Sequence, residues 1–511
     1  MNNVTEYLER SMHAFPDKIF VKDDNESFTY REFYLRAAAS GKKISEYTSF
    51  RRPVPVFSEK SPSVLMAFFG ILYAGCFYTL VDPSFPSDRV AKMLDTLDPD
   101  VVICHENEIE TLRASGCEKP VITVEELLAL PLPTDSEADA YAYSVRDALG
   151  DRDPAYCSFT SGSTGVPKGV LISHRSVLSF IDTFTKDFNI TCDDVIGNQA
   201  PFDFDVSVKD IYSAVSTGAT LVTIPKAKFM FPNAVMDMLE ENKVTTLIWA
   251  VSALCLLSRL HAFKYKVPAS IKTIMFSGEV MPVKQLNVWR SFYPHAMFVN
   301  LYGPTEITCN CTYYILDREF GEDDKIPAGR AFENSRVILL DENDKEVTKK
   351  DTNVPGEICV AGSSVALGYY NNPEATAKFF TKNPLVTGYD EIIYRTGDLA
   401  FYGEDGLMYF CGRRDFQIKH MGHRIELEEI ESVLNNVDIV DHACCFFDED
   451  RQKIVACYVG SEDKKAIIAE MKKHVPDYMV PNIFRQFDAL PLNKNGKTDR
   501  KLLKSIYGEK K

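Results

Sequence analysis

The sequence predicts an α/β fold with a large N-terminal domain of layered α/β subdomains, a β-rich subdomain and a small α+β C-terminal domain. Short apolar segments alternate with helical patterns from residue 7 to residue 300, which is typical of helices that cover a sheet. Beyond Pro327, strand patterns follow one another between Gly and Asp turns. From residue 417 onwards, helical and strand patterns are mixed in a shorter stretch. A chain of 511 residues is too long for one core, so about two to four units are expected.

The first part of the chain alternates strand and helix patterns. Strands are predicted at 19–21, 27–30, 101–104 and 121–122, and a helix is predicted at 30–44. A polar, acidic connector is expected at 131–151, before a stretch rich in Ser, Thr and Gly. A helix is expected to open at Ser173 or His174, and further strands are predicted at 170–172, 219–224, 246–250, 273–276 and 297–300.

One apolar run, residues 64–81, is long enough to raise the question of a membrane span. Gly70 and Gly75 interrupt the run, and Asp82 follows it directly. We therefore expect a buried helix to about Ala74, a turn at Gly75 and a buried strand at 77–81, and no membrane span.

The end of the chain carries the β-rich and the α+β patterns. Strands are expected at 336–340, 356–361 and 407–410, and a boundary is expected near 412–416, where the pattern changes. Beyond it, the sequence predicts helices at 427–434 and 464–473 and strands at 442–447 and 453–459.

Composition excludes several classes of function. Hydrophobic residues make up 45% and charged residues 25% of the chain, as in ordinary globular proteins. A net charge of −16 argues against general nucleic-acid binding, which needs a basic footprint. The 13 cysteines are scattered without a C-x-x-C pair, and the N-terminus lacks a signal-peptide pattern. Reduced thiols and a cytoplasmic location are therefore expected.

The stretch YCSFTSGSTGVPKGV at 156–170 has the composition of a phosphate-binding loop. It offers backbone N–H groups, small hydroxyl donors and one cation, Lys168. The spacing of a Walker A motif is missing, because Gly169 and Val170 follow the lysine. Read alone, the stretch also fits a flexible linker or a surface turn.

Four more motifs make the pattern specific. They are NLYGPTE at 300–306, YRTGD at 394–398, GRRDFQIKHMGHRIELEEIE at 412–431 and NKNGKTDR at 493–500. With the loop at 156–170 and in this order, they resemble the adenylate-forming superfamily, which includes acyl-CoA synthetases and luciferases. The resemblance covers nearly the whole chain. It is strongest to amino-acid adenylation enzymes, both stand-alone D-alanine–D-alanyl carrier protein ligases and adenylation domains of nonribosomal peptide synthetases.

The resemblance implies a reaction in two steps. ATP and an amino acid give an aminoacyl-adenylate and pyrophosphate, and the aminoacyl group then passes to the phosphopantetheine thiol of a carrier protein. ATP and Mg²⁺ are the implied cofactors. The implied domains are an adenylation core at 1–412, a hinge at 413–416 and a mobile lid domain at 417–511.

The nucleotide-binding residues implied by the resemblance come from several motifs. Glu306 matches the magnesium ligand, a hard oxygen donor, and Tyr302 matches the residue that stacks on adenine. Asp398 matches the carboxylate that binds the ribose, although an Asp before a hairpin can also just cap a turn. The implied phosphate loop is Thr160, Ser161, Gly162, Ser163, Thr164, Gly165 and Lys168, and the other implied nucleotide contacts are Gly278, Glu279, Asn300, Gly303, Thr305 and Arg413.

Two residues near the C-terminus carry the implied chemistry and motion. Lys497 matches the catalytic lysine that neutralises charge between the substrate carboxylate and the α-phosphate. Asp415 matches the hinge about which the small domain rotates after adenylation. That rotation is implied to withdraw Lys497 and to bring the 419–426 segment to the active site.

Asp205 decides the substrate class, because its motif resembles the pattern in which an aspartate pairs with the α-ammonium of an amino acid. A buried carboxylate without a partner is costly, so a cationic ligand would justify it. The alternative is that Asp205 only caps the helix that follows. Motif positions place the side-chain pocket at Val206, Lys209, Leu254, Met275, Ser277, Leu301, Cys309 and Asn310.

D-alanine is the first substrate that the resemblance suggests, but two pocket residues depart from that pattern. D-alanine ligases typically have a cysteine where this chain has Ser277, and Lys209 is unusual in a pocket for a methyl group. A larger or polar amino acid, including an acidic one that meets Lys209, is one explanation. The other is that Lys209 points away and pairs with Asp210 or another acid.

The implied partner is a carrier protein supplied in trans, since no carrier motif follows Lys511 and no condensation domain precedes Met1. No nucleic acid and no membrane span are expected. An acyl- or aryl-coenzyme A ligase shares the nucleotide motifs and is separated by Asp205. A non-catalytic nucleotide sensor is the alternative outside enzymes.

Overall fold

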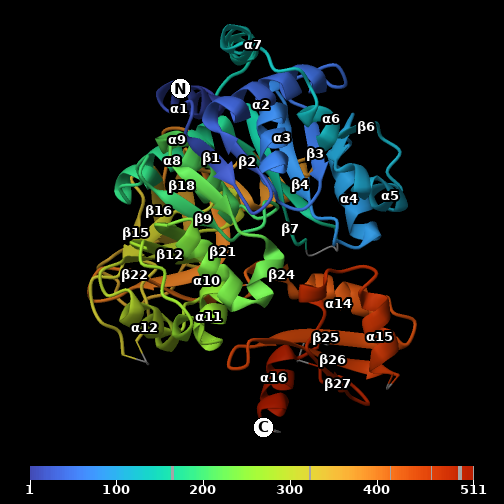
Figure 1. The fold of residues 1–511 in the computed structure, drawn as a ribbon. Helices are drawn as coiled ribbons and strands as arrows, with labels where there is room; N and C mark the ends of the chain where they lie inside the picture. The colour runs from blue at the N-terminus through green and yellow to red at the C-terminus, as the bar shows by residue number, and fades with distance from the viewer. Residues whose placement is uncertain (163–165, 322–323, 415, 462, 493–497, 510–511) are drawn as a thin grey trace.

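The computed structural model describes residues 1–162, 166–321, 324–414, 416–461, 463–492 and 498–509. Figure 1 shows a large body, coloured blue to yellow-orange, and a smaller orange-to-red body below it that holds the C-terminal helices and strands. The predicted α/β fold with a large and a small domain is confirmed. Within these described ranges, no helix is both long and apolar enough to cross a bilayer.

The first sheet of the large body has seven strands in the order β19-β8-β7-β4-β3-β5-β6. Pairs among β3 to β7 are parallel, whereas β7·β8 and β8·β19 are antiparallel. Parallel strands need helical crossovers, which the sequence between them supplies. The strands are β3 (Pro53–Phe57), β4 (Phe77–Val81), β5 (Val102–Cys104), β6 (Val121–Thr123), β7 (Pro154–Thr160), β8 (Lys168–Ser173) and β19 (Gly368–Tyr369).

The second sheet has nine strands in the order β15-β14-β13-β12-β11-β9-β10-β1-β2. Its centre is parallel and its two edges are antiparallel. The strands are β1 (Ile19–Lys22), β2 (Ser27–Thr29), β9 (Val195–Asn198), β10 (Thr220–Thr223), β11 (Thr246–Ala250), β12 (Thr273–Ser277), β13 (Met297–Tyr302), β14 (Thr312–Ile315) and β15 (Arg330–Ala331).

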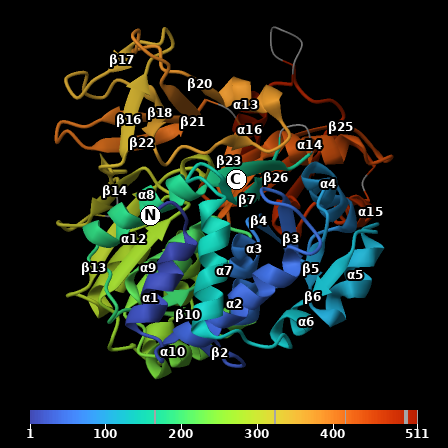
Figure 2. The same ribbon diagram turned by 90° about the horizontal axis from the view of Figure 1, so that it is seen from above.

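Helices cover both sheets of the large body (Figures 1 and 2). They are α1 (Thr5–Ala14), α2 (Tyr30–Ile44), α3 (Pro62–Tyr73), α4 (Ser87–Leu97), α5 (Ile109–Ala114), α6 (Val124–Leu128), α7 (Asp135–Asp147), α8 (His174–Asp187), α9 (Val206–Thr217), α10 (Pro232–Glu241), α11 (Val251–Arg259) and α12 (Val283–Phe292). Short 3-10 turns lie at Glu106–Glu108, Lys226–Met230, Ala262–Lys264, Thr305–Ile307 and Asp477–Met479.

The apolar run at 64–81 forms a core helix and a core strand, as predicted. Helix α3 begins after Ser61, which accepts a hydrogen bond from the Val64 N–H, and every residue of the helix is buried. Gly75, with φ of 73°, makes the turn into β4, where left-handed backbone favours glycine. The run therefore lies inside the protein.

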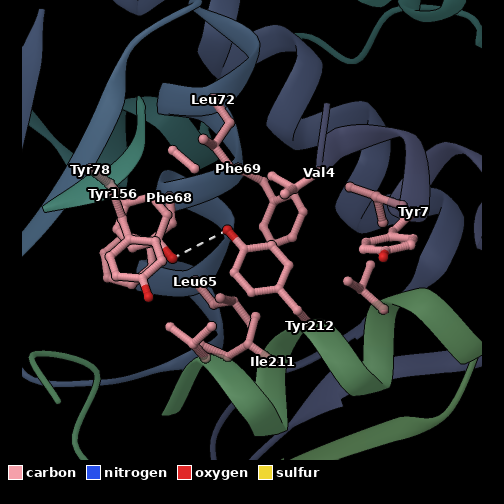
Figure 3. Close-up of a cluster of buried hydrophobic side chains, with 14 of the residues drawn as sticks. Val4, Tyr7, Leu65, Phe68, Phe69, Leu72, Tyr78, Tyr156, Ile211 and Tyr212 are labelled. Carbon is pink, nitrogen blue, oxygen red and sulfur yellow. Dashed lines mark hydrogen bonds between the residues drawn. The ribbon is translucent and has the colours of Figure 1, made fainter. Parts of the chain in front are cut away.

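Aromatic side chains join α3 to α9 between the two sheets (Figure 3). Phe68 stacks on Tyr78 with ring centroids 4.2 Å apart, and Tyr78 meets the Tyr212 hydroxyl at 3.2 Å. Truncating Phe69, which packs in the same cluster, is expected to cost about 3–5 kcal/mol of stability. This core fixes the N-terminal end of α9 relative to β7, both of which contribute to the site described below.

The polar, acidic connector expected at 131–151 contains a helix that was not predicted. Helix α7 begins at a capping box, in which the Thr134 side chain and Glu137 satisfy each other's backbone N–H groups. Its buried residues are Ala138, Ala142 and Val145, which are too small to give a strong apolar period. An ion pair between Arg31 and Asp135 and other contacts attach it to α2.

The β-rich subdomain is a sheet in the order β17-β16-β18-β21-β20, with β22 paired to β21. It lies at one edge of the large body, as Figure 2 shows for β16, β17 and β18. Its elements are β16 (Ser335–Leu340), β17 (Glu346–Val347), β18 (Gly356–Gly362), α13 (Pro373–Phe379), β20 (Phe380–Lys382), β21 (Ile392–Tyr402) and β22 (Met408–Arg413).

The C-terminal unit consists of a hairpin and a three-stranded sheet with helices. It has its own hydrophobic core, which includes Ile430, Tyr458 and Met471. The hairpin turns at Met421 and Gly422, whose φ angles are 53° and 83°, as a tight two-residue turn requires. The elements are β23 (Gln417–His420), β24 (His423–Glu426), α14 (Leu427–Asn435), β25 (Val440–Asp448), β26 (Lys453–Gly460), α15 (Lys464–Met471), β27 (Ile483–Gln486) and α16 (Arg500–Glu509).

Candidate active site

A cavity opens where the ends of β7, β12 and β13, the N-terminus of α9 and the β23–β24 hairpin meet. It encloses about 760 Å³, its open mouth included. Ligands of open α/β sheets typically bind at the carboxyl ends of strands, and this cavity has that position. Its wall consists of Arg89, Ser158, Phe159, Thr160, Ser161, Asp203, Phe204, Asp205, Val206, Ser277, Gly278, Gly303, Pro304, Thr305, Cys309, Asn310, Lys419, Gly422, His423, Arg424, Tyr478 and Met479.

The predicted phosphate loop joins β7 to β8 at the cavity. Thr160 ends β7, Ser161 is buried beside it, and Lys168 begins β8. The Lys168 ammonium lies 5.5 Å from the ring centre of Tyr369 and 5.3 Å from that of Phe379, and burial lowers its pKa. Three more residues of the predicted loop, Ser163, Thr164 and Gly165, lie outside the described residues.

The predicted ribose carboxylate, Asp398, is almost fully buried. Arg413 donates a hydrogen bond to one of its oxygens, and the Tyr302 hydroxyl donates to the other. The ring of Tyr302, the predicted adenine platform, lies 5.7 Å from the Lys419 ammonium of the hairpin. These residues come from three different motifs, and the structure brings them together.

Three other predicted nucleotide contacts are used within the protein. The Asn300 amide donates to the Pro327 carbonyl at 2.8 Å, and Glu279 accepts the Gly422 N–H at 2.8 Å. Gly303 must be a glycine, because a Cβ there would lie 2.5 Å from the Asn310 Cα. This close approach of Gly303 to Asn310 forms part of the cavity wall.

Glu306, the predicted metal ligand, is fully buried. Its two carboxylate oxygens accept hydrogen bonds from the Tyr369 hydroxyl at 2.7 Å and from Arg424 at 2.6 Å. Burial by itself would raise the pKa of Glu306, but Arg424 and Tyr369 outweigh it and hold the pKa below its ordinary value. Glu306 is therefore ionised at neutral pH and paired with a cation from the C-terminal unit.

The hairpin and α14 also form hydrogen bonds with groups of the phosphate loop. The Ser161 hydroxyl donates to the Arg424 carbonyl at 2.8 Å and accepts the Glu426 N–H at 3.1 Å. The Gly162 N–H donates to Glu429 at 3.1 Å, and Glu429 also pairs with Arg89 of α4 at 2.9 Å. Arg89 and Glu429 were missed in the sequence, because an arginine on an amphipathic helix and a glutamate in an acidic run are ordinary surface patterns.

Asp205 stands at the N-terminus of α9 and faces the cavity. As far as the structure describes the chain, its carboxylate makes no capping hydrogen bond to the first turn, so capping does not explain it. Burial raises its pKa, and the nearby Lys209 opposes that rise. Its backbone carbonyl accepts the Cys309 thiol at 3.0 Å.

Lys209 does not point away from the pocket. Its side chain is fully buried, and its ammonium donates to Ser277 at 3.1 Å and to Asn310 at 2.8 Å. Asp210 accepts instead from the Asn198 amide at 2.7 Å. Of the two alternatives for Lys209, the one in which it points away and pairs with Asp210 or another acid is therefore wrong.

The rest of the predicted side-chain pocket divides in two. Val206, Ser277, Cys309 and Asn310 line the cavity, whereas Leu254, Met275 and Leu301 belong to hydrophobic clusters and are not among its described lining residues. Thr308 and Cys309 have left-handed φ angles of 56° and 73°, which cost about 1–3 kcal/mol each and recur at functional sites. The strained pair turns the chain back against the cavity after Glu306.

Comparison with known proteins places this site in a family. The model for the AMP-binding enzyme matches residues 8–370, and the model for the AMP-binding enzyme C-terminal domain matches residues 429–497. The chain belongs to the AMP-binding enzyme family. The predicted resemblance is thereby confirmed.

Relatives within the AMP-binding family are of two lengths. Bacitracin synthase 1 of Bacillus licheniformis is 32% identical over 98% of this chain, but the chain spans only 9% of that protein. A D-alanine–D-alanyl carrier protein ligase of Bacillus cereus (strain AH187) is 32% identical over 98% of both chains. The matched region is thus a whole protein in one relative and a small part of the other.

Solved structures share the fold. The Vibrio cholerae adenylation domain AlmE, in complex with glycyl-adenosine-5'-phosphate, superposes with a TM-score of 0.86 at 20% identity and covers 100% of this chain and 98% of its own. The structure of IdnL1 superposes with a TM-score of 0.80 at 26% identity, covering 96% of this chain and 99% of its own. The two-domain arrangement is therefore the one found in adenylation domains.

Proposed function

We propose that this chain activates an amino acid with ATP and transfers it to the phosphopantetheine thiol of a separate carrier protein. In the first step a substrate carboxylate oxygen attacks the α-phosphorus of ATP, and pyrophosphate leaves. In the second step the thiol sulfur attacks the acyl carbon, and AMP leaves. The observation that carries the proposal is Asp205, a half-buried, uncapped carboxylate that lines the same cavity as Thr160 and Ser161 of the phosphate loop.

Residues from several motifs are available to bind the nucleotide. Asp398, with Arg413 beside it, suits a ribose, since a carboxylate accepts hydrogen bonds from two neighbouring hydroxyls. Ser161, Gly162 and Lys168 offer a hydroxyl, an N–H and a cation to the phosphates. The presence of both kinds of group, with Ser161 in the cavity wall, supports ATP as the second substrate.

Glu306 fits a magnesium site, because Mg²⁺ is usually bound by one or two carboxylates together with substrate phosphates. Among the described residues no cluster of three potential metal ligands was found, so the remaining ligands would come from ATP and water. When bound, Mg²⁺ would neutralise charge on the departing pyrophosphate. Glu306 can take that role only after Arg424 has moved away from it.

The arrangement of the two bodies fits the second step. Glu429 accepts the hydrogen bond of the Gly162 N–H, which the triphosphate would need. Arg424 donates to Glu306, which the metal would need. The C-terminal unit therefore has to move between the two steps, about a hinge for which we propose residues 413–416 between domains at 1–412 and 417–511. Lys497, the proposed catalytic lysine, and Asp415, the proposed pivot, lie outside the described residues.

The cellular setting and the first substrate to try follow from the same observations. All 13 cysteines are free thiols, which supports a reducing compartment such as the cytoplasm. D-alanine is the first substrate to test, because a D-alanine–D-alanyl carrier protein ligase is a relative of the same length.

Amino-acid-dependent pyrophosphate exchange tests the proposal, with loading of a phosphopantetheinylated carrier protein as the second readout. Asp205→Asn keeps the shape but removes the charge, and we expect it to lower kcat/KM for the amino acid by about 10²–10³-fold. Lys497→Ala is expected to abolish exchange while sparing transfer from a preformed adenylate. Exchange stimulated by short acids without an amino group, and unchanged in Asp205→Asn, would establish the acyl-coenzyme A ligase instead.

A further inference from the structure

A lysine ammonium lies buried beside the candidate substrate pocket. Lys209 is 0% exposed, and its two hydrogen-bond acceptors are Ser277 at 3.1 Å and Asn310 at 2.8 Å. Both acceptors line the cavity. The lysine thus stands directly behind two polar wall residues of the pocket.

Lys209 forms no ion pair within the described part of the chain, although Asp205 and Asp210 attract its charge from farther away. No carboxylate of a described residue lies within 4.0 Å of its ammonium, and its two acceptors are a neutral hydroxyl and a neutral amide. An ammonium has three N–H donors, so one donor has no partner here. Leaving a buried charge unpaired is strongly unfavourable, and burial accordingly lowers the pKa of Lys209.

A second lysine, which is half-buried, shows what a fully hydrogen-bonded ammonium looks like. The Lys60 ammonium has four oxygen acceptors between 2.8 and 3.2 Å, from the backbone and side chain of Asn198 and the carbonyls of Gln199 and Ala200. That lysine is structural and needs no ligand. Lys209 has half as many acceptors, and both of them line the cavity.

The position of Lys209 relative to Asp205 sets the order of charges along the pocket. The two residues are four positions apart at the start of α9, so they share one face of the helix, about 5–6 Å apart between Cβ atoms. A ligand whose ammonium pairs with Asp205 can therefore direct a second group towards Lys209. The group that would both accept the third N–H of Lys209 and balance its charge is an anion.

We infer that the substrate is an amino acid with a carboxylate side chain, such as aspartate or glutamate, and that Lys209 selects it together with Ser277 and Asn310. This inference rests on the proposed function. An alanine methyl group would leave the third donor of Lys209 unpaired and the buried charge uncompensated. The amides asparagine and glutamine have the right shape but no charge.

Pyrophosphate exchange with matched substrates tests the inference. The set is D- and L-glutamate and aspartate, their amides glutamine and asparagine, D-alanine and glycine. We expect one dicarboxylic acid to exceed its own amide in kcat/KM by at least about 100-fold, since the amide leaves the buried charge without an anionic partner.

Two variants assign the preference to the lysine. Lys209→Met removes the charge at similar length, and we expect it to raise KM for the dicarboxylic acid by about 100-fold with a smaller change in kcat. Its exchange with the neutral amide or with methionine should be retained or increased, which shows that the variant folds. Lys209→Gln is the second variant if Lys209→Met does not fold.

The possible outcomes test the inference separately from the proposed function on which it rests. A preference for D-alanine, glycine or an amide that Lys209→Met leaves unchanged overturns the inference and leaves amino-acid adenylation intact. Exchange with no amino acid at all overturns the proposed function, and the inference with it.

Discussion

Two cations lie at the same cavity and differ in what they are paired with. Arg424, from the C-terminal hairpin, is paired with Glu306 at 2.6 Å, whereas Lys209, from the large body, has only Ser277 and Asn310. The paired cation holds two parts of the protein together in one arrangement. Lys209 forms no ion pair among the described residues and has a third N–H donor to offer, which makes it the better candidate for binding a ligand.

The largest expected effect comes from removing the carboxylate that is paired with Arg424. Glu306→Gln takes away the proposed magnesium ligand and leaves Arg424 buried without its counter-charge. We expect pyrophosphate exchange to fall by about 10³-fold, because electrostatic stabilisation of the transition state is lost. Transfer from a preformed adenylate should fall less, and equal losses in both steps would contradict the assignment to the first step.

Removing the cation itself should affect the other step. Arg424→Met frees Glu306 and weakens the arrangement in which the hairpin lies in the site. Since the ion pair with Glu306 is lost, we expect carrier loading to fall by about 10–100-fold, which corresponds to about 1.4–2.7 kcal/mol. Exchange should be unchanged or faster, and a loss of exchange larger than that of loading would show that Arg424 acts in the first step.

The neighbouring ion pair offers a smaller and more selective change. Glu429→Gln removes the charge that pairs with Arg89 and weakens the acceptor of the Gly162 N–H. We expect the KM for ATP in exchange to fall by about 3–10-fold, because the phosphate loop is released. The matched variant Arg89→Met should shift the equilibrium in the same direction, and the double variant should add little to either single one. A higher KM for ATP in both single variants would contradict a competition between Glu429 and phosphate.

The smallest expected effect is one of pH. His423 of the hairpin stacks on Tyr478 at 3.5 Å and meets Phe204 of the large body at 4.6 Å. Burial, with added repulsion from Lys226, His420 and Arg89, lowers the pKa of His423 to about 3. Protonation therefore favours the separated state, in which Phe204, Lys226 and Arg89 no longer face the ring and the pKa of His423 is closer to its ordinary value of about 6.5.

Neutral His423 stabilises the arrangement in which the hairpin lies against the large body. This stabilisation is fully present above pH 6.5 and is lost as the pH falls towards 3. We expect carrier loading to decrease by about 3-fold between pH 7 and pH 5.5, relative to exchange in the same buffers. His423→Phe keeps the ring contacts and should abolish that relative decrease. An identical pH profile in wild type and variant would rule out this histidine as the cause.

Much of the fold follows from local patterns. The helix at 30–44 and the strand at 246–250 have the predicted ends, because apolar period and flanking residues agree there. Helix α7 was missed because its buried face is made of alanines and one valine, which give a weak period. Its capping box, Thr134 to Glu137, was the available signal.

The site was predicted in outline but not in its contacts. Motifs named Glu306, Asp398, Asp205 and Lys209, yet no motif states that Arg424 lies on Glu306 or that Glu429 takes the Gly162 N–H. Such contacts depend on how two separate bodies are placed, which sequence period and spacing do not encode. Whether Lys209 pairs with a surface acid or faces the pocket likewise depends on the direction of its side chain, which the sequence does not reveal.

One measurement tests the comparison between the two cations most directly. It is the dissociation constant of non-hydrolysable aminoacyl-adenylate analogues, measured by calorimetry for glutamyl, aspartyl and alanyl forms with wild type and Lys209→Met. We expect one acidic analogue to bind wild type at least about 100-fold more tightly than the alanyl form, and the difference to shrink to a few-fold in the variant. Tighter binding of the alanyl form to wild type, or a preference that survives in the variant, would contradict the account of Lys209.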